Sequence, residues 1–266
     1  MRLVEAAGKR YALLQAARDS DYVKKVYGGY FDVFVAAFGE EGEIWDLYRV
    51  VEGEFPDKDE LEKYDGFVVS GSPYDSYGND DWILQLCLLL QTLNTMKRKF
   101  LESALAIRYI LCRALGGKVG KARTGWDIGL RRVKLVKDLG PCSFNGDLSE
   151  NPPSLSIIEC HQDEVWEVPS GAQVIAFSDK TGVEMFTMGD HILGIQGHPE
   201  YTKDILYNLV DRLLINNCIK KDLAERAKLG LEMAEADRKS WGMICRNFLK
   251  GRSQKNPLKR IPDYWI

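Results

Sequence analysis

The chain of 266 residues lacks the features that would assign it to a membrane, secreted or nucleic-acid-binding class. No apolar run reaches eighteen residues, so the sequence predicts no transmembrane helix. The apolar stretch at residues 11–17 is short and stops at Arg18, unlike the apolar segment of a secretory signal peptide. The formal net charge of −3 provides no basic excess, so we expect no nucleic-acid partner and no membrane partner.

The cysteines lack the spacing of a metal site or of a redox pair. Six are present and no two form a C-x-x-C motif, so we expect free, mostly buried thiols, no metal and no cofactor. Free thiols in a chain without a predicted signal segment favour a reducing compartment, the cytosol. The six are Cys87, Cys112, Cys142, Cys160, Cys218 and Cys245.

The first half of the chain alternates buried strands with helices. Short apolar or β-rich runs at residues 11–17, 43–51, 66–70 and from 99 onward predict four strands. Helical patterns lie between and after them at residues 21–38, 80–97 and 105–115, the first broken by Gly28-Gly29. This order predicts an α/β fold with a mostly parallel central sheet and helices on both faces.

The second half predicts a small antiparallel extension followed by helices. Six short strands are expected at residues 131–136, 154–160, 164–168, 173–178, 183–188 and 192–196. Helical spacing follows at residues 203–215, 220–236 and 238–250. We therefore expect one domain over residues 9–216, a helical extension over 217–252 packed on it, and a mobile tail over 253–266.

The chain has only three histidines, and two of them follow predicted strands. His198 lies in Gln196-Gly-His-Pro-Glu-Tyr201, where Glu200 could orient its ring for general-base chemistry; a loop histidine that caps the next helix is the alternative. His161 opens His161-Gln-Asp-Glu-Val165, which is either a ligand-binding loop or a hydrogen-bonded turn. His191 is expected in a solvated hairpin turn without a role.

A glycine-bearing loop follows the third predicted strand. Ser70-Gly-Ser-Pro73 could turn amide groups towards a developing oxyanion, or it could be a simple strand-to-loop turn. Three features occur in this order: the glycine-bearing loop, a fourth strand that leads into a helix, and a His-x-Glu motif late in the chain. Together they resemble the class I glutamine amidotransferase superfamily, and within it the plant γ-glutamyl peptidases. The resemblance runs from about Lys9 to Arg252. The stretches that carry it are Val23-Lys-Lys-Val-Tyr-Gly-Gly-Tyr30, Phe67-Val-Val-Ser-Gly-Ser72, Gly78-Asn-Asp-Asp-Trp-Ile83, Cys160-His-Gln-Asp-Glu-Val165, Gln196-Gly-His-Pro-Glu-Tyr201 and Ala236-Asp-Arg-Lys-Ser-Trp241.

The resemblance implies a fold, a reaction and a set of site residues. Members of this family are hydrolases that use a Cys-His-Glu triad, and the γ-glutamyl peptidases act on γ-glutamyl bonds of glutathione conjugates. By resemblance, His198 would be the base and Glu200 its orienting carboxylate. Gly71, Ser72 and the elbow residue Leu105 would serve the oxyanion and the substrate. The loop residues that would help to seat the γ-glutamyl group are His161, Gln162 and Asp163.

The sequence departs from its family where the nucleophile belongs. The family pattern is Gly-Ile-Cys-x-Gly-His-Gln on a strand-to-helix turn, a position that lowers the pKa of the thiol. Here the stretch reads Leu101-Glu-Ser-Ala-Leu-Ala-Ile-Arg-Tyr109, and the nucleophile position falls at Ala104 or at Leu105 in the two possible alignments. We interpret the loss of the whole elbow as a block replacement, such as an alternative exon, which sequencing the transcript across residues 99–111 tests.

Three functions follow from this combination. The first is a γ-glutamyl peptidase-like protein whose hydrolysis is impaired because the nucleophile is absent. The second is a non-catalytic protein that binds a small γ-glutamyl compound or a partner. The third is a glutaminase-type amidotransferase subunit, and the chain shows no synthetase domain after Leu249.

Overall fold

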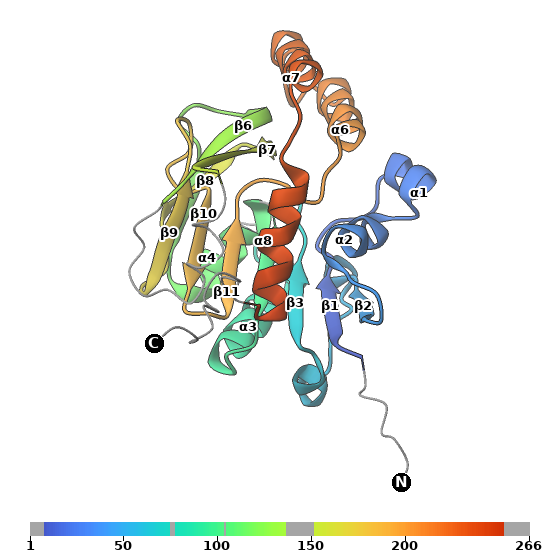
Figure 1. Cartoon of the computed structure of the whole chain (residues 1–266), viewed down its shortest axis with the longest axis vertical. Helices are drawn as coiled ribbons and strands as arrows, with labels where there is room; N and C mark the ends of the chain where they lie inside the picture. Colours follow the sequence, from blue (N-terminus) through green and yellow to red (C-terminus); the bar gives the residue numbers. More distant parts are fainter. Residues whose placement is uncertain (1–7, 75–77, 104, 137–151, 253–266) are drawn as a thin grey trace, which may run out of the picture.

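The computed structural model describes residues 8–74, 78–103, 105–136 and 152–252, and of residues 105–109 only the backbone. The first half contains β1 (Arg10–Leu14), α1 (Asp21–Tyr27), α2 (Tyr30–Phe38), β2 (Ile44–Tyr48), β3 (Gly66–Val69), α3 (Asp81–Thr95), β4 (Phe100–Ser103) and α4 (Leu105–Leu115), with two short 3₁₀ turns at Val50–Glu52 and Lys58–Lys63. The second half contains β5 (Lys118–Lys121), β6 (Asp127–Leu135), β7 (Ser154–His161), β8 (Asp163–Glu167), β9 (Ala172–Phe177), β10 (Met185–Met188), β11 (Ile192–Ile195), α6 (Lys203–Ile215), α7 (Lys221–Met233) and α8 (Arg238–Lys250). Figure 1 shows their arrangement.

A nine-stranded mixed sheet forms the centre of the fold. Its strand order is β2-β1-β3-β4-β11-β10-β9-β6-β7. The strands from β2 to β11 are parallel, and β10, β9, β6 and β7 continue the sheet in antiparallel pairs. The expected parallel sheet with a small antiparallel extension is confirmed. The parallel half brings the carboxyl ends of β1, β3, β4 and β11 to one edge, where α/β proteins bind ligands.

Alternate residues of the parallel strands enter two separate cores. In β1, Leu13 packs with the residues of α1, α2, α6, α7 and α8 on one face, whereas Leu14 packs with those of α3 and α4 on the other. Both leucines are completely buried. Because successive side chains of a strand point to opposite faces, a run that is apolar throughout requires helices on both sides. The expected two-sided coverage is therefore confirmed.

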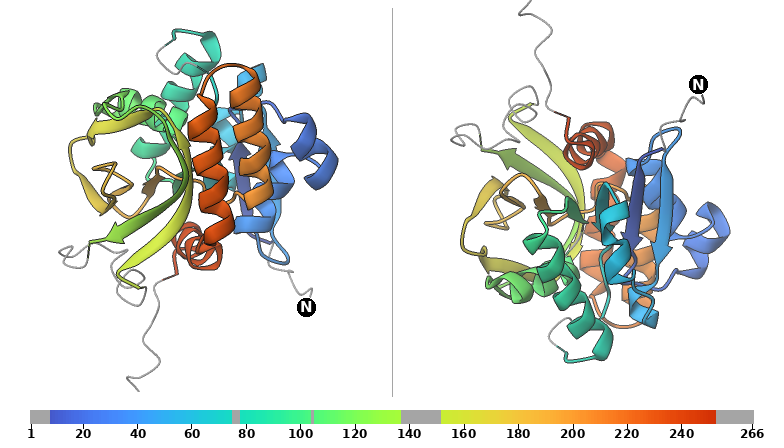
Figure 2. Two further views of the ribbon diagram at one scale, coloured as in Figure 1. Left: turned by 90° about the horizontal axis from the view of Figure 1, so that it is seen from above. Right: turned by 90° about the horizontal axis from the view of Figure 1, so that it is seen from below.

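The C-terminal helices pack on one face of the sheet, α7 against β6 and α8 against β7 and the parallel strands β4 and β3. In Figure 2, α7 and α8 lie beside the curved strands β6 and β7. Trp241, Ile244 and Phe248 of α8 belong to the same core as the sheet residues. The helices predicted at 203–215 and 238–250 have these bounds in the structure, whereas the expected tail at 253–266 lies outside the described residues. None of the described helices is both long and apolar enough to span a bilayer.

Two local predictions were wrong or incomplete. The prediction of a solvated His191 is wrong: it is only 3% exposed, and its Nε2 lies 2.8 Å from Asn94 Oδ1. Burial, assisted by Lys97, lowers the pKa of this imidazole. The strands of the second half begin earlier than the predicted start at residue 131. Strand β5 precedes that start and pairs with β8 in a separate two-stranded sheet. Its polar sequence, Lys118-Val-Gly-Lys121, carries too little apolar alternation to predict a strand.

Candidate active site

A histidine–carboxylate pair lies at the carboxyl end of β11. His198 Nδ1 is 2.9 Å from Glu200 Oε1, and both side chains are buried. Because Glu200 occupies Nδ1, the other ring nitrogen, Nε2, is the one that a ligand can reach, and it has no protein partner among the described residues. A carboxylate that fixes one ring nitrogen and leaves the other free is the arrangement of a general base and its orienting group.

The loop that carries this pair is fixed from three sides. The His198 backbone N–H donates to the Ile158 carbonyl at 2.8 Å, which ties the loop to β7. The imidazole stacks on the Tyr201 ring, with the two ring centroids 3.8 Å apart. Arg238 Nη2 donates to the Glu200 carbonyl at 3.1 Å. The orientation of the imidazole is therefore set by the fold rather than by a bound ligand.

Ser103, the last residue of β4, completes the polar network. Its hydroxyl donates to Glu200 Oε2 at 2.6 Å, and Ser103 and Ile195 are register partners on the neighbouring strands β4 and β11. This hydroxyl therefore binds the carboxylate oxygen that His198 does not contact. A nucleophile must be within hydrogen-bond reach of the base that takes its proton. The bond to Glu200 makes Ser103 a positioning residue and not a replacement nucleophile.

Ser103→Ala is expected to lower the free energy of unfolding by about 1–3 kcal/mol, because it leaves a buried oxygen of Glu200 without its hydrogen bond. Urea denaturation at pH 7 measures the effect. Ser154→Ala is the matched control, since the Ser154 hydroxyl bonds Arg132 at the surface. It should change stability by less than about 0.5 kcal/mol. Equal stabilities of the two variants would contradict this role of Ser103.

The glycine-bearing loop after β3 lies next to the end of β1. The Ser70 hydroxyl accepts from the Ala16 backbone N–H at 2.9 Å and donates to the Gly71 carbonyl at 3.0 Å. The Ser72 hydroxyl accepts from the Tyr74 backbone N–H at 3.2 Å. These bonds shape the loop at the sheet edge where β1 and β3 end.

The predicted His161 loop is a tight turn between β7 and β8. His161 is 4% exposed, its Nδ1 lies 2.9 Å from the Asp163 carbonyl oxygen, and its Nε2 lies 3.3 Å from Glu159 Oε2. Gln162 Oε1 accepts from Lys121 Nζ at 3.0 Å. The hydrogen-bonded turn weighed from the sequence is therefore present, and the same turn also borders the cavity described next.

One cavity of about 510 Å³ connects these elements. Ligand pockets of proteins fall in this size range. The site residues predicted from the sequence that line it are Gly71, Ser72, His161, Gln162, Asp163, His198 and Glu200. The two candidate nucleophile positions are not among them: Ala104 lies outside the described residues, and the side chain of Leu105 is likewise not described.

Several lining residues were missed by the sequence analysis. They comprise the cations Arg18, Lys121 and Arg212 and an aromatic and aliphatic group, Tyr30, Phe34, Trp126, Tyr201, Leu209 and Leu213. Arg18 follows β1, so the rule that ligands bind at the carboxyl edge of a parallel sheet could have identified it. Arg212 and its neighbours lie in α6, whose helical pattern gives no signal for a site.

Two described cysteines, Cys160 and Cys218, line the cavity. Burial, aided by the nearby Glu159 and Asp127, raises the pKa of the Cys160 thiol to about 12. Since the thiolate is the reactive form, this raised pKa keeps the thiol largely protonated and unreactive at pH 8. The raised pKa therefore makes Cys160 a poor nucleophile.

Iodoacetamide at pH 8 is expected to alkylate Cys218 and to leave Cys160 largely unmodified, as peptide mass mapping would show. Cys218 is exposed and also borders the cavity, so it is an internal control for reagent access. The rate at Cys160 should be at least about 100-fold lower. Comparable alkylation of the two residues would show that Cys160 is activated.

The described residues contain no group of three or more His, Cys, Asp and Glu side chains arranged to hold a metal ion. The polar lining of the cavity includes the cations Arg18, Lys121 and Arg212 and the histidine–carboxylate pair.

Sequence comparison identifies the family. Residues 47–206 match the family model described as glutamine amidotransferase class-I. The chain is 54% identical to gamma-glutamyl peptidase 5 of Arabidopsis thaliana over 248 residues, covering 93% of this chain and 98% of that protein. It is 51% identical to gamma-glutamyl peptidase 3 of the same plant over 244 residues, with coverage of 91% and 97%.

Structural comparison gives the same fold. A glutamine amidotransferase from Thermotoga maritima superposes with a TM-score of 0.69 at 20% identity, covering 93% of this chain and 99% of that one. The superposition supports the fold alone, whereas the extent of sequence identity establishes the family. The chain is a γ-glutamyl peptidase-like protein and belongs to the class I glutamine amidotransferase family.

Proposed function

We propose that this protein binds small γ-glutamyl compounds in the cavity beside His198 and does not hydrolyse them through a covalent thiol intermediate. It would be a pseudoenzyme of a hydrolase family. The relatives at 54% and 51% identity bear the name gamma-glutamyl peptidase, which suggests the γ-glutamyl group as the ligand. The observation that carries the loss of turnover is the sequence of residues 101–109, which contains no cysteine.

The composition of the cavity supports binding of a compound with both charged and apolar parts. Arg212 has no carboxylate partner among the described residues, so a ligand carboxylate could pair with it. Asp163, which lies 3.7 Å from Lys121 Nζ, and Glu200 add negative charge to the lining and can attract an ammonium group. Phe34, Trp126 and their apolar neighbours offer surface for a substituent that is not charged.

The chemistry of the remaining side chains supports the absence of covalent turnover. Ser103 is bonded to Glu200, and the raised pKa of Cys160 keeps its thiol protonated. Losing a nucleophile typically costs several orders of magnitude in rate, although a pocket and a base can retain a small residual activity. The pair His198 and Glu200 would thus contribute to ligand binding through a hydrogen bond that Nε2 accepts from the ligand.

Two measurements on the purified chain test this function. Isothermal titration calorimetry with glutathione S-conjugates should detect binding, while an assay for released glutamate should detect turnover at least about 10³-fold slower than that of an active relative. Binding without turnover supports the proposal. Turnover equal to that of an active relative would refute the pseudoenzyme, and the absence of any binding would refute the retained pocket.

Arg212→Ala provides a matched test of ligand orientation. We expect it to weaken binding of the conjugate about 10-fold, because one charge-assisted hydrogen bond is lost. Arg226→Ala, on the exposed face of α7 and paired with Asp222, is the control and should leave the affinity unchanged. Equal affinities of the two variants would exclude Arg212 as the carboxylate partner.

We also propose that the protein acts in the cytosol. Its five described cysteines are all free, including the exposed Cys218, as expected for a reducing compartment. Fractionation of tissue extracts with an antibody to this chain tests the location, and enrichment in a membrane or vacuolar fraction would contradict it.

A further inference from the structure

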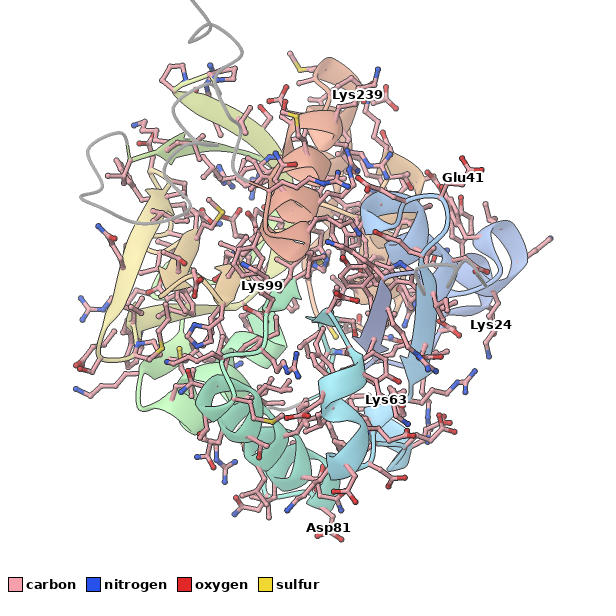
Figure 3. The ribbon with its side chains drawn as sticks, turned by 60° about the horizontal axis from the view of Figure 1, so that its bottom comes forward. Lys24, Glu41, Lys63, Asp81, Lys99 and Lys239 are labelled. Atoms are coloured by element: carbon pink, nitrogen blue, oxygen red, sulfur yellow. The ribbon has the colours of Figure 1, made fainter. Side chains whose placement is uncertain are left out.

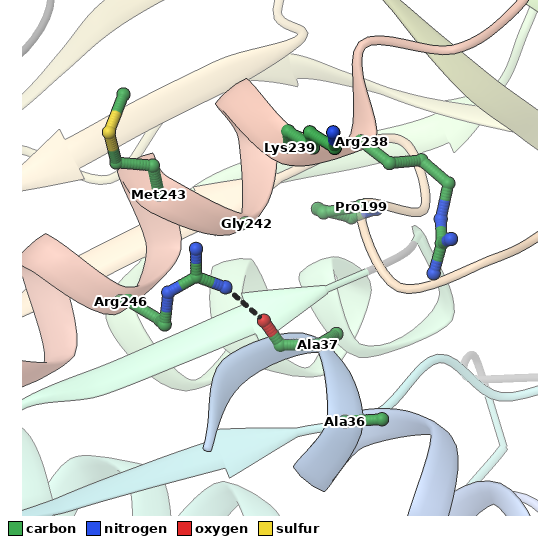
Figure 4. Close-up of a pocket in the computed structure, with 8 residues that line it drawn as sticks. All are labelled: Ala36, Ala37, Pro199, Arg238, Lys239, Gly242, Met243 and Arg246. Atoms are coloured by element: carbon green, nitrogen blue, oxygen red, sulfur yellow. Dashed lines mark hydrogen bonds between the residues drawn. The ribbon is translucent and has the colours of Figure 1, made fainter. Parts of the chain in front are cut away.

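A second, shallower pocket lies behind the loop that carries His198 and Glu200. Its volume is about 430 Å³, and it is formed by the end of α2, by Pro199 and by one side of α8. Figure 4 shows its residues, which are Ala36, Ala37, Pro199, Arg238, Lys239, Gly242, Met243 and Arg246. The larger cavity shares none of these residues, so the two pockets are separate.

Three cations surround this pocket and no acidic side chain lines it. Arg238, Lys239 and Arg246 form no ion pair with a carboxylate in the described part of the chain. The acidic residues just before α8 are engaged elsewhere: Glu235 Oε1 lies 2.5 Å from Lys203 Nζ, and Asp237 Oδ2 accepts from the Ser156 backbone N–H at 2.6 Å. In a chain of net charge −3, this pocket is a local centre of positive potential.

The backbone around the pocket keeps two of the cations in place without neutralising them. Arg246 Nη1 donates to the Ala37 carbonyl at 2.7 Å, and Arg238 Nη2 donates to the Glu200 carbonyl at 3.1 Å. Gly242 lies beside the hydrogen bond between Arg246 and Ala37. A Cβ atom at Gly242 would lie 3.0 Å from Arg246 Nη1 and 3.4 Å from the Ala37 carbonyl oxygen. Glycine at this position thus keeps the space beside Arg246 open.

We infer that this pocket binds a small organic anion with at least two negative charges, carried by phosphate or carboxylate groups. Guanidinium groups form charge-assisted hydrogen bonds with both kinds of oxyanion, and Lys239 adds a third charge. The apolar part of the wall, which includes Ala36, Pro199 and Met243, suits the carbon skeleton of such a ligand. The site is distinct from the γ-glutamyl cavity and does not depend on its function.

Binding of an anion in this pocket would change the loop that carries His198 and Glu200, which lines the larger cavity. An anion that competes for Arg238 Nη2 weakens its bond to the Glu200 carbonyl. Pro199 lines the anion pocket, whereas the residues on either side of it, His198 and Glu200, line the larger cavity. The amides of His198, Glu200 and Tyr201 should therefore respond to anion binding even though the anion lies on the other side of the loop.

Calorimetric titration of the full chain with pyrophosphate and with citrate tests the inference, with acetate as the singly charged comparison. We expect one binding site for at least one multivalent anion and none for acetate, and the two probes distinguish phosphate from carboxylate preference. Lys239→Glu should weaken binding at least 10-fold. Lys24→Glu makes the same change of net charge on α1, away from α8, and should alter the affinity less than 2-fold (Figure 3).

Both lysines are exposed, so neither variant is expected to unfold the protein. Backbone NMR locates the site: the amides of Ala37 and Gly242 and those of His198, Glu200 and Tyr201 should shift, whereas those of Gly71 and Ser72 should not. Three results would each overturn the inference. The first is that neither multivalent anion binds at 5 mM, which is on the order of the upper limit for a useful affinity. The second is that the two charge reversals weaken binding equally. The third is that the amides of Gly71 and Ser72 shift while that of Gly242 does not.

Discussion

Restoring the family elbow is expected to raise the rate of glutamate release from a γ-glutamyl conjugate by about 10³-fold or more. The variant carries S103G, A104I, L105C, I107G, R108H and Y109Q, which together write Gly-Ile-Cys-Ala-Gly-His-Gln at residues 103–109. His198 Nε2 is free to take the proton of the new thiol, and Glu200 Oε1 still orients the ring although S103G removes the hydrogen bond to Oε2. The measurement is the release of glutamate under saturating conjugate.

The control is the same variant with L105A in place of L105C, which restores the glycines and removes only the sulfur. It should remain as slow as the natural chain. Equal rates of the two variants would show that the sulfur at position 105 is not sufficient. Calorimetry would then separate a lost pocket, which would no longer bind the conjugate, from a misplaced thiol, which would leave binding intact.

The general arrangement of the fold could be predicted because the parallel strands are apolar on both faces. Leu13 and Leu14 are adjacent and both are completely buried, one in each core. Such a run has few alternatives to a central parallel strand. By contrast, β5 was missed because its pairing with β8 depends on hydrogen bonds between backbones whose side chains are largely polar.

The residues around His198 could be predicted in part. The pairing with Glu200 follows from a spacing of two residues at a strand end, and the structure has it. The contact of Ser103 with Glu200 could not be predicted, because it requires the register of β4 against β11, a long-range property. The burial of His191 was missed for the same reason, since its partner Asn94 is 97 residues away.

The cations of both pockets were the least predictable feature. Arg212 lies in α6, and Arg238 and Arg246 lie in α8, in helices whose sequence patterns fit ordinary amphipathic surface helices. Their significance appears only when the neighbouring elements show which cations have carboxylate partners and which do not. Charge composition alone, with 36 basic and 39 acidic residues, gives no indication of either site.

The C-terminal extension contacts the sheet through helix α8. We expect this contact to contribute more to the free energy of unfolding than the rest of the extension does. Trp241 is 1% exposed and packs in the core formed with the sheet. Its Nε1 donates to the Ser156 carbonyl at 3.1 Å, and the same oxygen accepts from the Asp237 backbone N–H at 2.8 Å. The start of α8 is thus joined to β7 by packing and by hydrogen bonds, so the extension is integral to the fold.

Trp241→Ala is accordingly expected to lower the free energy of unfolding by about 3–5 kcal/mol, since it removes a large buried ring and leaves a cavity. Urea denaturation monitored by far-UV circular dichroism measures the loss. Met233→Ala is the control, because Met233 at the end of α7 is 79% exposed and its truncation should cost less than about 0.5 kcal/mol. If both variants unfolded at the same urea concentration, the packing of α8 on the sheet would contribute little, and residues 217–252 would behave as an appendage to the domain.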